Sequence, residues 1–156
     1  MDYLMQYECK EKHGTVTRQI VKVKDVASIA RVCDKVRCVP NFLGNGTGSI
    51  AFVFDPMTDI YAIDDVGAII VCKRPTLFQP GAAHVHVTFW DKILRGREDL
   101  CSTLAKHVLI EEQFSWLWTL IPENAGAIRF FARRVGFQLA LKSKGIEHLI
   151  YPGIGV

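Results

Sequence analysis

The feature that most constrains the fold is the order in which strand-like and helix-like patterns of apolar residues follow one another along the chain. Apolar residues alternate with polar ones in extended runs and recur every three or four residues in helical runs. The order is strands, a helix, strands, a helix, a strand, a helix and a final hairpin. This succession predicts one α/β (α+β) domain over residues 1–156, with a mixed, mostly antiparallel, twisted sheet flanked by helices.

The predicted strands are extended runs separated by polar turns. They cover residues 3–10, 15–23, 50–54, 60–63, 67–72, 83–90, 114–121, 137–143 and 146–151. Lys144 and Gly145 separate the last two runs, and such a pair is typical of a two-residue hairpin turn.

Each of three predicted helices has a start signal, a buried stripe or a stop signal. The first begins after Asp25, a competent N-cap, and carries the stripe Val26, Ile29, Ala30, Cys33 and Val36. The second runs from Glu98 to about residue 109, with the stripe Leu100, Cys101, Leu104, Ala105 and Val108. The third follows Pro122, with Asn124 as its expected cap and Gly136 as its end.

Composition excludes several classes of protein. The chain is 49% apolar and 22% charged, which is ordinary for a globular domain, and its net charge of +3 is too small to imply nucleic acid. The five cysteines show no C-x-x-C spacing, so we expect them to be reduced. No apolar run reaches the roughly 20 residues of a membrane span, and no secretory signal opens the sequence, so we expect a cytoplasmic protein.

Residues 116–137 carry a resemblance to a known family. They comprise a strand, Asn124, Ala127 three residues later, an amphipathic helix, and Gly136–Phe137 opening the next strand. This pattern resembles the strand-helix-strand end of the GNAT N-acetyltransferases. More narrowly, residues 83–90 and 121–137 look like the small GNAT-like proteins encoded by tailed bacteriophages, some of which are virion or head-assembly proteins.

The resemblance implies a GNAT fold, acetyl-CoA as cofactor, and acyl transfer to an amine. It places the cofactor along the strand at 83–90 and at the start of the following helix. The implied cofactor-binding residues are Val87, Thr88 and Phe89 through their backbone, Arg95, Gly96 and Arg97 at the phosphates, and Asn124 from the last helix.

The phosphate-binding segment departs from the family pattern, which is Arg/Gln-x-x-Gly-x-Gly/Ala. Here Glu98 stands at a position of a small residue, and Asp99 follows it. Carboxylates at a helix N-terminus complement the helix dipole, but they also repel a pyrophosphate. Two interpretations therefore stay open: guanidinium contacts to CoA from Arg95 and Arg97, or an ordinary charged helix start in which Gly96 makes the turn.

His84 and His86 are the candidate catalytic bases, because they share one face of a strand and neutral imidazole accepts protons near neutral pH. The alternative is a pair of packed histidines. A metal site is not expected, since no third ligand lies nearby in sequence. The general acid of many family members, a tyrosine in the last helix, is replaced by Phe130 and Phe131.

Three further features have a functional and a structural interpretation. The glycines of 44–48 look like a phosphate cradle but precede a strand pattern, which favours a turn. Trp116 and Trp118 could line a channel or pack in the core. Arg129, Arg133 and Arg134 could form a cationic ridge for nucleic acid or an acidic partner, or a solvated helix face.

Two functions follow. The first is acyl-CoA-dependent N-acetyl transfer, with acyl-CoA and an amine acceptor as partners, in the cytoplasm of a host cell. The alternative is a non-catalytic GNAT-like structural or assembly component of a phage virion, with other virion proteins as partners.

Overall fold

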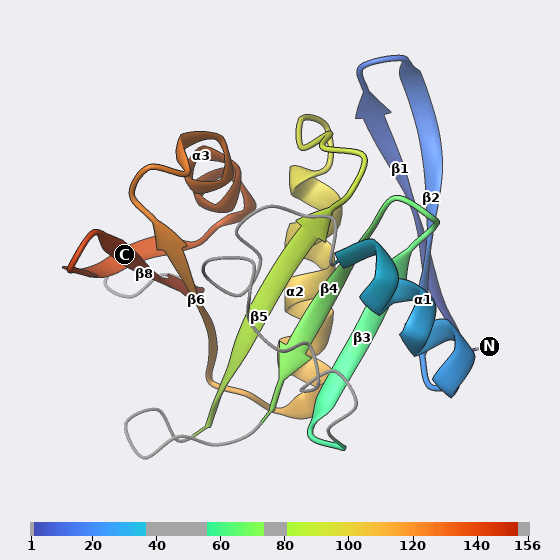
Figure 1. Cartoon of the computed structure of the whole chain (residues 1–156), viewed down its shortest axis with the longest axis horizontal. Coiled ribbons are helices and arrows are strands. Elements are labelled where there is room, and N and C mark those ends of the chain that lie inside the picture. The colour runs from blue at the N-terminus through green and yellow to red at the C-terminus, as the bar shows by residue number, and fades with distance from the viewer. Residues whose placement is uncertain (1, 37–55, 74–80, 153–156) are drawn as a thin grey trace. The chain divides into compact units, whose positions relative to one another are not determined.

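A computed structural model describes residues 2–36, 56–73 and 81–152, and the side chains from Leu4 onward (Figure 1). The strands are β1 (Asp2–Glu11), β2 (Gly14–Val23), β3 (Thr58–Ile63), β4 (Gly67–Cys72), β5 (Ala82–Phe89), β6 (Trp116–Pro122), β7 (Gln138–Ser143) and β8 (Ile146–Tyr151). The helices are α1 (Val26–Val36), α2 (Glu98–Glu112) and α3 (Gly126–Val135). No helix in this part of the chain is long and apolar enough to span a bilayer.

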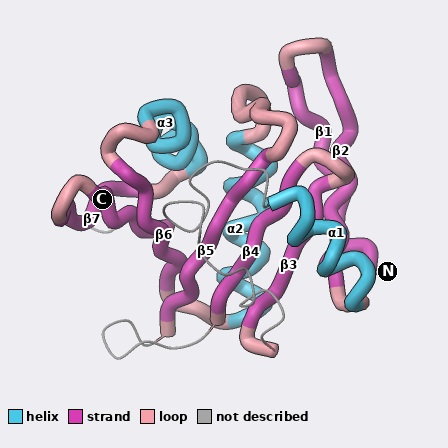
Figure 2. Tube along the Cα trace, viewed as in Figure 1, coloured by secondary structure: helices cyan, strands magenta, loops and turns pink. Residues whose placement is uncertain are grey.

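The eight strands form one sheet in the order β1-β2-β3-β4-β5-β6-β8-β7. The pairs β2–β3, β3–β4, β6–β8 and β7–β8 are antiparallel, and β5–β6 is parallel. The mixed, mostly antiparallel α+β fold predicted from the periodicity is therefore confirmed, and Figure 2 shows the alternation of strands and helices along the trace. The predicted strand at 50–54, the glycines of 44–48 and residues 74–80 lie outside the described residues.

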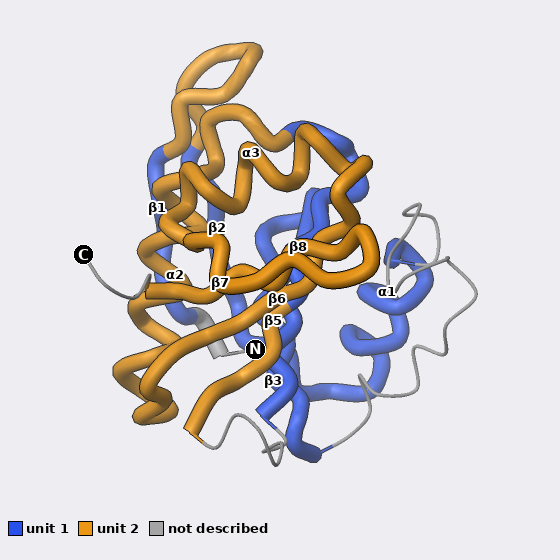
Figure 3. Tube along the Cα trace, turned by 90° about the vertical axis from the view of Figure 1, so that its left-hand side faces the viewer, with its two compact units in different colours: residues 1–8, 17–74, 86–93 blue, residues 9–16, 75–85, 94–156 orange. Residues whose placement is uncertain are grey.

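Contacts divide the chain into two compact units, which Figure 3 colours separately. Unit 1 comprises residues 1–8, 17–74 and 86–93, and unit 2 comprises residues 9–16, 75–85 and 94–156.

In unit 1, α1 packs against β3 and β4. Its core cluster joins Val32, Cys33 and Val36 of the helix to Ile60, Ala68 and Ile70 of the strands. Asp25 caps the helix as predicted, since its Oδ2 accepts hydrogen bonds from the Ser28 amide (2.9 Å) and hydroxyl (2.8 Å). The predicted burial of Val26 is wrong: it is 72% exposed, because the packed stripe of α1 extends only from Ile29 to Val36.

In unit 2, α2 buries the five residues predicted as its stripe, from Leu100 to Val108. The helix continues to Glu112, three residues beyond its predicted end. The prediction that Asn124 caps α3 is wrong, because Asn124 lies in the turn after β6 and the residue before the helix is Ala125, with no side-chain cap.

The hairpin of β7 and β8 completes unit 2. Its turn residues have the predicted left-handed conformation, with φ of 53° at Lys144 and 77° at Gly145. The register shifts between Leu139 and Leu141, which marks a bulge, and every residue of β7 is exposed at the end of the strand order.

Gly136 ends α3 as predicted. Its φ is 127°, and its amide donates hydrogen bonds to the carbonyls of Ala132 and Arg133. A Cβ at this position would lie 2.7 Å from the ring of Tyr151.

We expect Gly136→Ala to lower the free energy of unfolding by about 1–3 kcal/mol, because alanine disfavours this φ and its methyl group meets the Tyr151 ring. Gly126→Ala, in the first turn of the same helix, is the control, since nothing lies within 4 Å of its added Cβ. Urea unfolding measures both. Equal stabilities of the two variants would contradict the packing described for Gly136.

Candidate functional site

β5 carries the two candidate bases and changes its partners along its length. It pairs in parallel with β6 through Ala82–Trp116, Ala83–Leu117 and His84–Trp118. Among the described residues, the pairing with β6 ends there.

His84 is held by an aromatic contact at the last paired position. Its ring stacks on Trp118 with centroids 4.0 Å apart and planes 6° from parallel. Trp118 is half-buried, so the indole serves as a packing surface for the imidazole. The sequence left open whether Trp118 lines a channel or packs in the core. In the structure, Trp118 stacks on His84.

His86 lies two residues further along β5, in unit 1, whereas His84 belongs to unit 2. Burial lowers the pKa of His86 to about 4, so this imidazole is neutral at neutral pH. The adjoining backbone segment predicted to meet CoA includes Phe89, whose carbonyl accepts a hydrogen bond from the Lys92 amide (3.0 Å). Thr88 is buried, and no described residue hydrogen-bonds its hydroxyl.

Gly96 makes the turn into α2, as predicted, with φ of 90°. A Cβ on this residue would lie 2.2 Å from the carbonyl oxygen of Lys10, so the tip of the β1–β2 hairpin packs directly on the turn. Glycine is needed here for both its conformation and its size.

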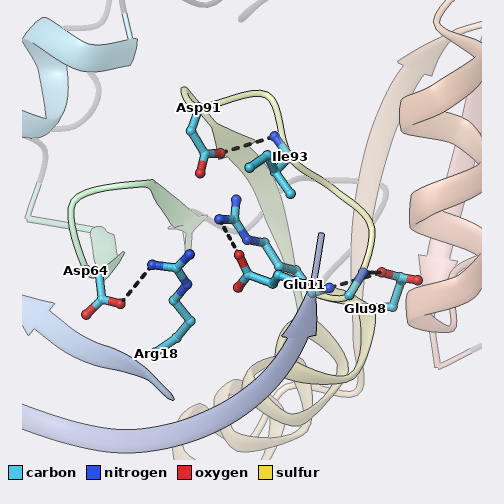
Figure 4. A network of polar contacts seen from close by, with 8 residues as sticks. Glu11, Arg18, Asp64, Asp91, Ile93 and Glu98 are labelled. Carbon is cyan, nitrogen blue, oxygen red and sulfur yellow. Dashed lines mark hydrogen bonds and ion pairs between the residues drawn. The ribbon is translucent and has the colours of Figure 1, made fainter. Parts of the chain in front are cut away.

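Arg97, predicted to hold cofactor phosphate, has a different contact. Its side chain is 0% exposed, and Nη2 donates to Oε1 of Glu11 at 2.9 Å, on a carboxylate that is 4% exposed. Figure 4 shows the Glu11 carboxylate joined by a dashed line to a guanidinium. The pair joins the end of β1 to the residue before α2. The positive charge of Arg97, which was predicted to bind a phosphate, is therefore paired with Glu11.

Two backbone amides in the turn before α2 are bonded by a side chain of the helix. Glu98 folds back so that Oε1 accepts hydrogen bonds from the amides of Gly96 (2.7 Å) and Arg97 (3.0 Å). Figure 4 labels Glu98 at this turn. Both amides precede the helix, which begins at Glu98, and the Arg97 amide also donates to the Leu94 carbonyl (3.1 Å). The Glu98 carboxylate therefore lies beside the helix start, where it repels an approaching pyrophosphate.

The remaining predicted cofactor residues lie at the surface of unit 2. Arg95 is exposed beside the Gly96 turn, and Asn124 is exposed in the turn that precedes α3. Arg95 lines a cavity of about 340 Å³ together with Glu98, Leu94 and residues of α3. Asn124 is not among the residues that line this cavity.

Two of the three arginines that could form a cationic ridge on α3 share one buried carboxylate. Arg129 Nη1 lies 2.6 Å and Arg133 Nη2 lies 3.1 Å from the two carboxylate oxygens of Glu147 on β8. The Glu147 side chain has no exposed surface. These two arginines therefore attach α3 to β8, which is the contact that sequence reasoning missed, and only Arg134 of the predicted ridge is left without an ion pair in the described part of the chain.

Within residues 2–36, 56–73 and 81–152, no three His, Cys, Asp or Glu side chains group as metal ligands.

No protein-family model and no curated protein matches the chain. Solved structures do match. The GNAT domain of S. lividans PAT superposes with a TM-score of 0.67 at 12% identity, over 94% of this chain and 96% of that domain. The chain has the GNAT fold.

Two further GNAT structures were solved with ligands. Campylobacter jejuni N-acetyltransferase PseH, in complex with acetyl coenzyme A, matches with a TM-score of 0.56 at 10% identity, over 85% of this chain and 96% of that one. Spermidine N-acetyltransferase from Vibrio cholerae, in complex with CoA and spermine, matches with a TM-score of 0.61 at 7% identity, over 85% and 94%. At these identities the likeness concerns the backbone.

We expect Arg97→Met to lower the free energy of unfolding by about 3–5 kcal/mol, because it leaves the buried Glu11 carboxylate without its partner. The double variant Arg97→Met/Glu11→Leu should recover most of this loss. Arg18→Met is the control, since its 3.4 Å pair with Asp64 is partly exposed and should cost less than about 1 kcal/mol. Chemical denaturation measures all three; equal losses for Arg97→Met and Arg18→Met would contradict the buried pair.

Glu147 predicts a pH dependence of stability. Hydrogen bonds from Arg129 and then Arg133 hold the pKa of Glu147 below its usual value of about 4.3. A lowered folded-state pKa stabilises the fold above the unfolded-state pKa, and this contribution is lost as pH falls through the folded-state value. Unfolding followed from pH 7 to about pH 2 should show a smaller acid loss in Glu147→Gln than in the wild type. Parallel profiles would contradict this assignment.

Proposed function

We propose that this protein is a non-catalytic GNAT-fold module that binds a macromolecular partner. The observation that carries the proposal is the position of Glu98, whose carboxylate bonds two amides in the turn that precedes α2. An incoming pyrophosphate would meet the negative charge of this carboxylate at the helix start. The buried Arg97–Glu11 pair adds to the argument, because it removes a cation from the same turn.

The absence of a tyrosine at the position of the family's acid agrees with this proposal. The middle of α3 carries Phe130 and Phe131, which have no transferable proton. A structural or assembly role in a phage particle, suggested by the sequence resemblance, is the setting we propose. Mass spectrometry of purified particles tests it, and consistent absence of the chain from particles would contradict that setting.

One observation favours the second candidate, acyl-CoA-dependent transfer to an amine. His86 of β5, one of the two candidate bases, is neutral at physiological pH and can therefore accept a proton. Release of free thiol from acetyl-CoA in the presence of spermine is the direct assay, since spermine is bound in the Vibrio cholerae neighbour. Thiol release above the rate without protein would support transfer over the binding module.

Binding of acetyl-CoA separates the two candidates. A working site would stabilise the fold by about 2.7 kcal/mol at a ligand concentration one hundred times its Kd. We expect no thermal shift for the wild type and a measurable shift for Glu98→Ala, which frees the amides of Gly96 and Arg97. Asp99→Asn is the matched control, because it removes an equal charge from the same turn and leaves the Glu98 hydrogen bonds in place. A wild-type shift as large as that of Glu98→Ala would overturn the proposal.

A further inference from the structure

The cavity between the start of α2 and α3 has a composition suited to protein recognition. Its apolar part comprises Leu94, Ala127, Phe130 and Phe131, and its charged rim includes Arg95 and Arg134. The four lining residues of α3 lie at positions 127, 130, 131 and 134, a spacing that places them on one face of the helix. Both elements belong to unit 2.

Phe130 is the unusual residue of this cavity. It is 64% exposed, whereas its neighbour Phe131 is 6% exposed and packs in the core. A large aromatic side chain in a concave surface offers a partner an apolar anchor, and aromatic residues and arginine are the types most often found at the centre of interfaces.

The charges around the cavity select the sign of the partner. Arg95 and Arg134 are exposed and form no ion pair within the part of the chain that the structure describes. The one carboxylate of the lining, Glu98, already bonds two amides. On α3 itself, Arg129 and Arg133 share the single carboxylate of Glu147, so Arg134 is the arginine of this helix that has no ion pair within the described residues.

We propose that this cavity docks an acidic segment of a partner protein, with an apolar side chain on Phe130 and carboxylates at Arg95 and Arg134. This inference rests on the proposed function, because a bound cofactor would compete for the same surface. We propose a protein segment and not a nucleotide, because the cavity places the exposed ring of Phe130 and the side chain of Leu94 beside the two guanidiniums.

The test uses the whole chain and a defined probe. A fluorescein-labelled peptide in which aspartate alternates with leucine is titrated and followed by fluorescence anisotropy. Two matched peptides carry lysine in place of aspartate, or glycine in place of leucine. We expect saturable binding of the first peptide, weakened by added salt, and affinities at least about tenfold lower for the other two.

Substitutions locate the binding. Phe130→Ser and Arg134→Glu should each lower the affinity about tenfold. The controls are Ile128→Ser, a half-exposed residue of α3 outside the cavity lining, and Lys106→Glu, an exposed residue of α2. Both controls should bind as the wild type does. No anisotropy change at peptide concentrations on the order of 1 mM, or equal binding by all variants, would overturn the inference.

Acetyl-CoA added to the same titration separates the two proposals. Peptide binding that acetyl-CoA does not disturb supports both. Absence of binding by either ligand overturns the docking site and leaves the non-catalytic module standing. Displacement of the peptide by acetyl-CoA, or binding of acetyl-CoA alone, overturns both, because the cavity would then be a cofactor site.

Discussion

The ion pair between Arg97 and Glu11 fixes the point at which α2 begins, and the chemistry of that end of unit 2 depends on it. A guanidinium without exposed surface must keep its partner, since an unpaired buried charge is strongly destabilising. The pair holds the tip of the β1–β2 hairpin against the turn at Gly96, where no side chain would fit. With the turn fixed in this way, Glu98 is placed to bond the amides of Gly96 and Arg97.

Three carboxylates together determine which positive groups of unit 2 can act on a ligand. Glu11 forms an ion pair with Arg97, and Glu147 forms ion pairs with Arg129 and Arg133. Glu98 accepts hydrogen bonds from two backbone amides. The GNAT fold is retained around these internal contacts, as the superpositions at 7–12% identity show. A backbone can therefore be shared with acetyltransferases while a carboxylate of the chain bonds the turn before α2, which is why fold alone does not define an activity.

The parts of the structure that local patterns govern could be predicted from the sequence. The stripe of α2, the cap at Asp25 and the left-handed turn at Lys144–Gly145 each depend on neighbours within a few residues, and each is confirmed. The cap assigned to Asn124 failed because a capping residue type also suits a turn, and the helix began two residues later. The role of Arg97 could not be predicted, since Glu11 lies 86 positions away and nothing local distinguishes a buried guanidinium from an exposed one. The sequence predicts that Glu98 repels a phosphate at the helix start. It does not predict the hydrogen bonds from Glu98 to the amides of Gly96 and Arg97, because these depend on the conformation of the Glu98 side chain.

The exposed strand at the end of the sheet has a consequence for the behaviour of the protein at high concentration. A free strand edge is a template for pairing with other molecules, and Leu139 and Leu141 of β7 add apolar surface to it. The bulge between these two leucines interrupts the regular ladder, and Lys142 and Lys144 place positive charge along and beside the strand. An interrupted ladder and a charged side chain each make it harder for a second strand to pair with β7 in register.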